Sequence, residues 1–170
     1  KVEELEKSLE ISKNKYYEKR ISILEKELSV HPLDKKSNLE LAQILAEKKD
    51  YDSSLVVLNK LLNAYPSDEE LLYKYAIVCL ASGDLSTAYE KAEILINKNP
   101  DNKDYQLLFG QLSTWLNIDP QKAKLNLEKV LSKEPSNYSS LSTLALLLIQ
   151  NNELSDAEKY LGRLSQLNSR

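Results

Sequence analysis

Apolar residues recur at three- and four-residue spacing through most of the chain, which is the period of one buried face of an α-helix. The segment 69–102 carries two such stripes, made of Leu72, Tyr75, Ala76 and Cys79, then of Ala88, Ala92 and Leu95. Gly83-Asp84 separates the two stripes, and Asn99-Pro100 ends the second because proline disfavours helix in the residue before it. The pattern predicts two helices joined by a short turn.

This two-helix pattern repeats along the chain. Pro32, Pro66, Pro100 and Pro135 lie 34, 34 and 35 residues apart, a period typical of helical hairpins stacked side by side. The spacing predicts a half unit at 17–34 and full units at 35–68, 69–102, 103–137 and 138–170. Only three glycines and five prolines are available for turns, so we predict an all-α fold.

Small residues recur at two places in each full unit, where small side chains would let two helices cross closely. The first set lies midway along the first helix and the second near the start of the second helix: Ala42, Ala76, Gly110 and Ala145, then Ser54, Ala88, Ala123 and Ala157. A large apolar residue precedes each member of the first set, in Leu41, Tyr75, Phe109 and Leu144.

Together with the closing prolines, these positions resemble the tetratricopeptide repeat (TPR) family, over about 135 residues from Lys35 onward. The resemblance implies a right-handed α-solenoid of four helix-turn-helix repeats with a leading half unit. A family of similar period that reads RNA bases fits less well, because its members tend to be basic and lack this small-residue pattern.

The chain departs from the family pattern at several positions. Early in the first helix, where tryptophan is common in the family, it has Asn38, Leu72, Gln106 and Leu141. The usually small residue late in the second helix is Leu61, Leu95, Val130 and Leu164, which should alter the superhelix. The third unit has one extra residue, which we place in the turn 116–120, where Asp119 should cap a helix beginning at Pro120. Ser67 with Glu70 and Ser155 with Glu158 have capping-box spacing.

Residues 1–16 differ from the rest of the chain. Val2, Leu5 and Leu9 line one narrow edge, and Lys and Glu fill most of the remainder. We predict a solvated helix that extends the half unit or tethers it to an upstream region. A short coiled coil is the alternative, although three apolar positions are fewer than such a prediction needs.

Charge and composition exclude several classes of function. The net charge is −3 and the pI near 5.4, with Lys and Glu interleaved, so no basic stripe is present for a nucleic acid. No apolar run approaches the length of a membrane span or signal-peptide core, which predicts a soluble domain of undetermined compartment. The chain begins at Lys1 and contains no methionine, so we interpret it as part of a longer protein, with membrane contact only through absent flanks.

Residues that could carry catalysis are scarce. His31 is the only histidine and stands beside Pro32 at a predicted helix end, and Cys79 is the only cysteine and lies on a buried stripe. No glycine-rich phosphate loop and no nucleophile elbow is present. We expect no enzyme activity, no cofactor and no metal site.

The resemblance implies a non-catalytic adaptor or scaffold that binds a protein segment on the concave face of its first helices. The segment should be apolar or mildly basic, because the surface is apolar and edged by acids. Carried over by position, the groove residues are Leu39, Gln43, Tyr73, Lys74, Ile77, Leu80, Leu107, Gln111, Leu146 and Ile149. Alternatively, another part of the full-length protein, such as its N-terminal helix, fills the groove.

Two further surfaces follow from the same pattern. Trp115, the only tryptophan, either packs beneath the lengthened turn or forms a partner-facing hot spot. On the last helix, Ala157, Leu161 and Leu164 should face their own unit, which leaves Tyr160 and Leu167 for a further helix or a homodimer contact. The rival functions are a self-association module forming a homo-oligomer, and an assembly or maturation factor for a membrane or cofactor-bearing complex.

Overall fold

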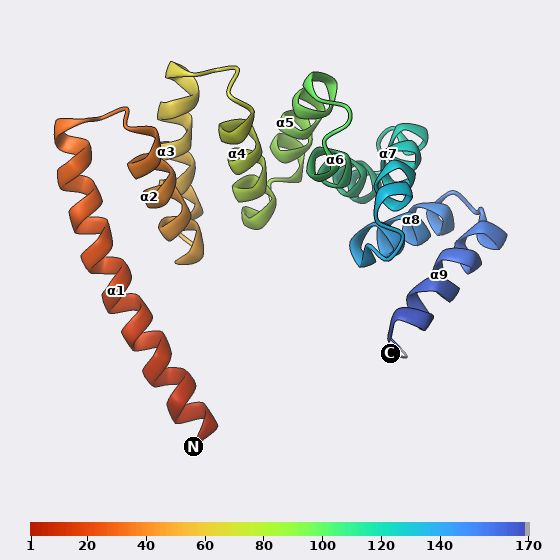
Figure 1. The fold of residues 1–170 in the computed structure, drawn as a ribbon, viewed down its shortest axis with the longest axis horizontal. Coiled ribbons are helices and arrows are strands. Elements are labelled where there is room, and N and C mark those ends of the chain that lie inside the picture. The colour runs from red at the N-terminus through yellow and green to blue at the C-terminus, as the bar shows by residue number, and fades with distance from the viewer. Residues whose placement is uncertain (169–170) are drawn as a thin grey trace. The chain divides into compact units, whose positions relative to one another are not determined.

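Residues 1–168 are described by a computed structural model and are built of α-helices (Figure 1). The nine helices in this range are α1 (Val2–Val30), α2 (Lys35–Glu47), α3 (Tyr51–Ala64), α4 (Glu69–Ser82), α5 (Leu85–Lys98), α6 (Lys103–Leu116), α7 (Pro120–Lys133), α8 (Tyr138–Gln150) and α9 (Leu154–Asn168). Between residues 1 and 168 no strand occurs, which confirms the predicted all-α class. None of these helices is both long enough and apolar enough to cross a membrane.

The chain divides into two compact units, Lys1–Ser82 and Gly83–Arg170. In the first unit α1 packs on α2, α2 on α3, and α3 on α4. In the second unit each helix from α5 to α9 packs on the next, and α6 also contacts α8. The division falls inside the repeat predicted over 69–102, and each unit is therefore described by itself.

The turn after each predicted second helix has the same backbone hydrogen bonds. In the turn at Pro66, the Tyr65 N–H donates to the Leu61 carbonyl at 2.8 Å, and the Asp68 N–H donates to the Tyr65 carbonyl at 3.1 Å. The corresponding pairs of bonds occur in the turns at Pro32, Pro100 and Pro135. The proline period thus marks a repeated turn geometry, as the sequence predicted.

An Asp or Asn stands two residues after each of these prolines and caps the next first helix. These residues are Asp34, Asp68, Asn102 and Asn137, and their side chains accept backbone N–H groups of the first turn at 2.8 to 3.3 Å. Such bonds satisfy N–H groups that have no partner within the helix.

The predicted helix starts at Ser67 and Ser155 need correction. The Asp68 carboxylate, one residue after Ser67, accepts the Leu71 N–H at 3.1 Å at the start of α4, and Ser155 lies inside α9, which begins at Leu154. Asp119 is the N-cap residue of α7 but has a left-handed backbone, with φ of 48°, and makes no side-chain capping bond. Its carboxylate accepts the Tyr89 hydroxyl at 3.1 Å.

The small residues predicted at helix crossings are buried. Ala42, Ala76, Ala88, Ala123, Ala145 and Ala157 are all at most 2% exposed. In the first unit the Ser54 hydroxyl donates to the Ala42 carbonyl at 2.7 Å, so α2 and α3 touch through these two residues. In the second unit a Cβ added to Gly110 would lie 2.6 Å from Leu127 Cγ, so α6 and α7 meet without room for a methyl group.

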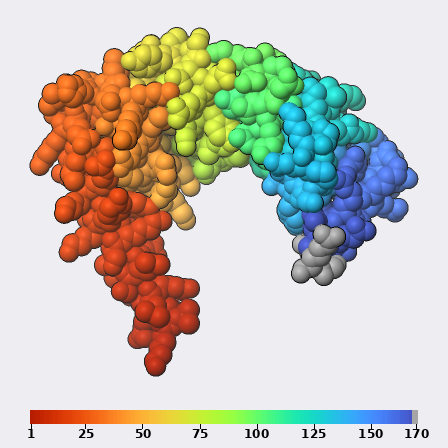
Figure 2. All heavy atoms as spheres, in the orientation of Figure 1, coloured from red at the N-terminus to blue at the C-terminus, as the bar shows by residue number. Residues whose placement is uncertain are grey.

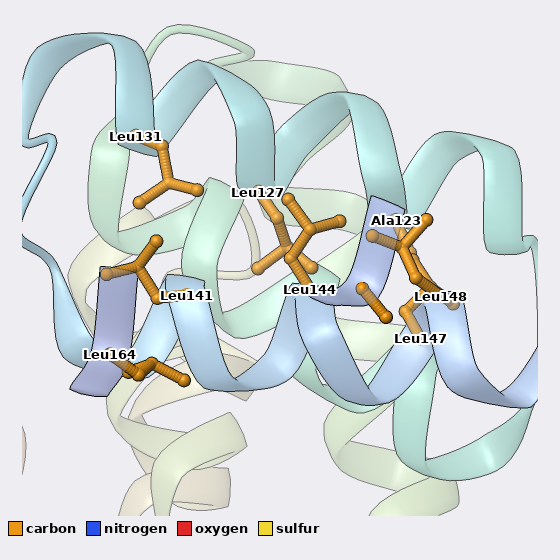
Figure 3. Close-up of a cluster of buried hydrophobic side chains, with 9 residues drawn as sticks. Ala123, Leu127, Leu131, Leu141, Leu144, Leu147, Leu148 and Leu164 are labelled. Atoms are coloured by element: carbon orange, nitrogen blue, oxygen red, sulfur yellow. The ribbon is translucent and has the colours of Figure 1, made fainter. Parts of the chain in front are cut away.

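The core of the second unit is a cluster of leucines from three helices (Figure 3). Ala123, Leu127 and Leu131 come from α7, Leu141, Leu144, Leu147 and Leu148 from α8, and Ala157 and Leu164 from α9. Apolar surface removed from water in this way supplies most of the folding free energy of such hairpins.

The leading helix α1 is continuous from Val2 to Val30, with no break at residue 16. Residues 1–16 are exposed throughout, and the start of α1 (red in Figure 2) projects away from α2 and α3. Within this stretch Lys13 still reaches Glu47 of α2, at 3.8 Å. Tyr17 is the first buried residue, and Leu24 follows it into a cluster with Leu41 and Ile44 of α2.

The predicted faces of α9 need correction. Leu161, expected against its own unit, is 45% exposed. Tyr160 and Leu167 were predicted to be available for contact with a further helix. They are partly buried against the leucine cluster of the same unit. The two candidates for a homodimer contact therefore contribute to the core of the second unit.

We predict that replacing Asp34 makes stability less dependent on pH. The bonds donated by Ser37 lower the pKa of the Asp34 carboxyl in the folded state. Its contribution is therefore complete above the unfolded pKa, about 3.9, and is lost as the pH falls through the lower folded value. Asp34→Asn should retain the cap but show a smaller decrease in Tm between pH 5 and pH 2 than the wild type. Asp34→Ala should have a lower Tm already at pH 7.

We predict that Gly110→Ala destabilises the protein by about 1–3 kcal/mol through overpacking against Leu127. Gly162→Ala is the matched control, because a Cβ at this helical glycine meets nothing within 4 Å. It should stabilise by about 0.5–1 kcal/mol through helix propensity. Urea unfolding of both variants checks the two opposite signs, and a neutral Gly110→Ala would mean that the α6–α7 crossing has room to spare.

Candidate functional site

The candidate site consists of the predicted groove positions on the first helices, and in the first unit these lie on α2 and α4. Leu39 is partly buried against a cluster containing Ala42, Leu58 and Val78. Ile77 is 37% exposed. Tyr73 and Leu80 are half-buried, while Gln43 and Lys74 are exposed. The predicted groove positions of the first unit therefore offer an apolar surface interrupted by polar side chains.

Most acids near these positions are already paired inside the first unit. Arg20 of α1 binds Glu40 of α2 through two hydrogen bonds of 2.5 and 2.7 Å. Glu47 accepts the Tyr17 hydroxyl and, at 3.0 Å, the Gln43 amide. These hydrogen bonds, from Arg20 and from Tyr17 respectively, lower the pKa values of Glu40 and Glu47, so both carboxylates stay charged at neutral pH.

Lys35, at the start of α2, also pairs with acids of the first unit. Its ammonium lies 2.8 Å from Asp68 and 2.8 Å from Glu70, both close to the start of α4. The acids that edge the predicted groove are thus largely neutralised by neighbours.

In the second unit the groove positions lie on α6 and α8. Leu146 and Ile149 are 39% and 45% exposed, and Trp115 at the end of α6 is 44% exposed. Leu107 is partly buried against the leucine cluster, and Gln111 is half-buried. Leu107 therefore supports the core, and we expect Leu146 and Ile149 to present the apolar surface.

Charge distinguishes the first helices of the two units. Helices α2 and α4 contain 13 and 14 residues and carry seven charged side chains. Helices α6 and α8 also contain 14 and 13 residues but carry only two, Lys103 and Asp104, both at the start of α6. The first helices of the second unit are therefore almost neutral along their length.

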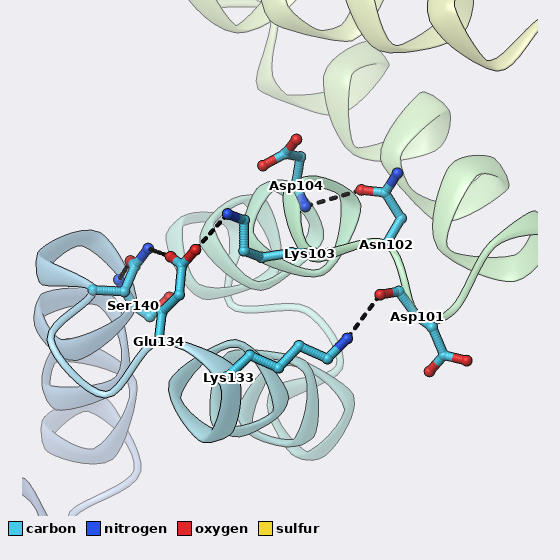
Figure 4. Close-up of polar contacts among 8 residues, drawn as sticks. Asp101, Asn102, Lys103, Asp104, Lys133, Glu134 and Ser140 are labelled. Carbon is cyan, nitrogen blue, oxygen red and sulfur yellow. Dashed lines mark hydrogen bonds and ion pairs between the residues drawn. The ribbon is translucent and has the colours of Figure 1, made fainter.

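The two charged residues of α6 are the first two of the helix, and Lys103 binds Glu134 in the turn at Pro135 (Figure 4). The Lys103 ammonium binds Glu134 at 2.5 Å, and Glu134 also accepts the Asn137 amide at 2.9 Å. The bond from Lys103, reinforced by Asn137, lowers the pKa of Glu134. Lys133 adds a bond to the Asp101 carbonyl at 2.9 Å.

Two buried polar residues were not recognised from the sequence. Asn38 donates to the Pro32 carbonyl at 3.1 Å and to the Asp34 carbonyl at 2.7 Å. Gln106 donates to the Pro100 carbonyl at 2.7 Å. Both stand at the position where the family commonly has tryptophan, and both hold the preceding proline turn. The recurrence of an amide side chain at equivalent positions two repeats apart could have identified them from the sequence.

Residues with potential for chemistry are dispersed. Among residues 1–168 no group of His, Cys, Asp and Glu could hold a metal ion. His31 is the C-cap residue of α1, and Cys79 is 1% exposed in the core. The geometry of this surface suits binding by shape and apolar contact.

Comparison with known proteins agrees with this architecture. Family models described as tetratricopeptide repeat match residues 37–68 and residues 118–169. The chain belongs to the tetratricopeptide repeat family. No curated protein sequence matches it.

Several solved TPR structures resemble the fold at low sequence identity. A MamA double mutant of strain RS-1 is 16% identical with a TM-score of 0.82, covering 95% of this chain and 90% of that one. A TPR protein from Parabacteroides merdae is also 16% identical, with a TM-score of 0.81 and coverage of 98% and 66%. YrrB, described as a TPR protein with an unusual peptide-binding site, is 14% identical, with a TM-score of 0.77 and coverage of 91% and 79%.

The TPR assignment supports a protein-interaction scaffold. In this family the first helix of each repeat lines the concave face, which is why the predicted groove positions lie on first helices. The groove residues themselves remain a prediction, because the similarity to solved structures concerns the fold.

We predict that the fluorescence of Trp115 reports an accessible side chain. With 44% of its surface exposed, the indole should emit at long wavelength and be quenched by acrylamide. N-acetyltryptophanamide provides the fully exposed reference, and Trp115→Phe the background. A short-wavelength emission that resists quenching would show that the indole is packed beneath the turn and is not a contact residue.

Proposed function

We propose that the chain is a protein-interaction scaffold that binds an apolar or mildly basic peptide segment along the concave positions of its first helices. The observation that carries the proposal is the neutral character of α6 and α8 together with the exposure of Trp115, Leu146 and Ile149. A surface of this kind in a chain that is 29% charged marks a place where water is displaced by a partner.

Apolar anchors are the main expected feature of the bound segment. Helical segments present such anchors at i, i+3 and i+4, and extended segments at alternate residues. The acids beside the concave positions of the first unit add little attraction for basic residues, because Glu40, Glu47 and Glu70 already have cationic or hydrogen-bonding partners. Large apolar side chains should therefore contribute more to affinity than charge.

We predict that Leu146→Glu combined with Ile149→Glu weakens peptide binding at least tenfold. Both side chains are partly exposed, so the Tm should change little. The measurement uses peptides selected from a random 12-residue display library on the wild-type protein, followed by calorimetric titration.

Leu125→Glu is the matched control, because Leu125 is 53% exposed on a second helix, α7. It should bind the selected peptides with wild-type affinity. Equal affinity of the double variant and the wild type would contradict the groove assignment. Leu107→Glu should instead lower the Tm, because Leu107 packs on the leucine cluster.

A further inference from the structure

A second groove lies in the first unit, away from the concave positions, between α1 and α3. Its volume is about 510 Å³. Ile21 of α1, Leu41 and Leu45 of α2, and Val56 and Val57 of α3 supply aliphatic walls. Val56 is 71% exposed at this site.

Three acidic residues stand in the same groove, namely Glu25 of α1, Asp50 at the N-cap of α3 and Asp52 in its first turn. The Asp50 carboxylate accepts the Ser53 N–H at 3.2 Å. None of the three forms an ion pair with any residue between 1 and 168. The groove therefore combines aliphatic walls with negative charge that no cation of the described chain balances.

In the second unit the equivalent positions lie on α5, α6 and α7, and their side chains contact one another within the chain. Tyr89 stands 68 residues after Ile21, and its ring lies 5.5 Å from that of Phe109, the counterpart of Leu41. Its hydroxyl donates to Asp119, the counterpart of Asp50, at 3.1 Å. Burial, reinforced by the bond to Asp119, raises the pKa of Tyr89 to about 12, so the hydroxyl keeps its proton at neutral pH.

A lysine of α7 joins this set of contacts. Lys122, the counterpart of Ser53, places its ammonium 4.7 Å from the centre of the Phe109 ring. The same ammonium lies 3.5 Å from Glu93, the counterpart of Glu25. A cation held by an aromatic face and a carboxylate is a favourable arrangement at a partly buried site.

The next pair of second helices, α7 and α9, is bridged in a related way. Lys124 occupies the position of Ile21 and Tyr89, and its ammonium binds Glu153 at 2.8 Å. Glu153 precedes α9 as Asp50 precedes α3. At both pairs of second helices in the second unit, a side chain of the chain itself thus donates to the acid at the start of the following second helix.

The first unit lacks these donors. Ile21 replaces the tyrosine or lysine, and Ser53 replaces Lys122, so Glu25 and Asp50 keep their places without a bridging side chain. We propose that a Lys or Arg of a partner protein, flanked by aliphatic residues, enters the groove between α1 and α3 and binds Glu25, Asp50 and Asp52. The partner supplies from outside the cation that Lys122 and Lys124 supply within the second unit.

The residues of the groove explain why it should bind both a basic head group and the aliphatic groups beside it. Its aliphatic walls accommodate the methylene stem of the basic side chain and its apolar neighbours. The carboxylates take the charged head, and their exposure makes the attraction sensitive to salt. Binding here is independent of the concave positions, and it goes beyond the proposed scaffold function.

The test compares the wild type with a filled variant, Ile21→Tyr with Ser53→Lys, which has at these two positions the residue types of their counterparts Tyr89 and Lys122. Peptides from a random 12-residue display library are selected on the wild type after depletion on this variant. We expect enrichment of Lys or Arg next to aliphatic residues, affinity reduced at least tenfold in the filled variant, and weaker binding at 0.5 M than at about 0.1 M salt. Amide shifts on binding should map to residues 21–25 and 52–57.

Glu25→Gln with Asp52→Asn removes charge without adding bulk and should weaken binding at least tenfold at an unchanged Tm. The concave variant Leu146→Glu with Ile149→Glu should leave these peptides unaffected, so failure of the proposed function and failure of this inference are distinguishable. Peptides without a cation, or equal binding to the filled variant, would overturn the proposal. So would a wild-type dimer that the filled variant disrupts, because a second copy of the chain would then be the occupant.

Discussion

The start of each helix is the constraint on which the repeat depends. A helix leaves its first N–H groups without partners, and a chain that begins a new helix every few residues meets this problem repeatedly. The protein solves it with Asp or Asn two residues after each repeat proline and with Asp at the turns before α3 and α5. Because the caps recur at the repeat period, every hairpin starts at an equivalent residue, and the small residues at the crossings come into register.

The sequence alone was sufficient for the architecture but not for its details. Proline spacing and the small-residue pairs predicted the hairpins, because both features act through local backbone geometry and burial. The caps were assigned to Ser67 and Ser155 because capping-box spacing does not reveal which oxygen reaches the N–H groups; Asp68 does so for α4. On α9, Leu161 is exposed and Tyr160 is partly buried, the reverse of the prediction. Both lie near the edge of one apolar stripe, where a small rotation of the helix about its axis decides which side chain is buried.

The groove positions illustrate the same limit. Carrying positions over from a family identifies which residues can line a surface, but exposure depends on the neighbours that a particular sequence provides. Leu107 is drawn into the leucine cluster, whereas Leu146 and Ile149 remain accessible. Likewise, the number of acids near the first helices predicted attraction for basic partners, yet Arg20 and Lys35 already neutralise Glu40, Asp68 and Glu70. Acidic positions between the second helices differ, because only some of them have a partner in the chain.

The continuous α1 helix has a consequence for local dynamics. Its first sixteen residues are solvent-exposed, and Lys13 reaches α2 through an exposed ion pair with Glu47 at 3.8 Å, while Tyr17 and Leu24 are held in the core. A helical segment without tertiary packing is only marginally stable in water. Fraying of α1 should therefore proceed from Val2 toward Tyr17 and stop there. Backbone amides of one and the same helix would then exchange with solvent on two separate timescales, with the boundary set by a single buried aromatic ring.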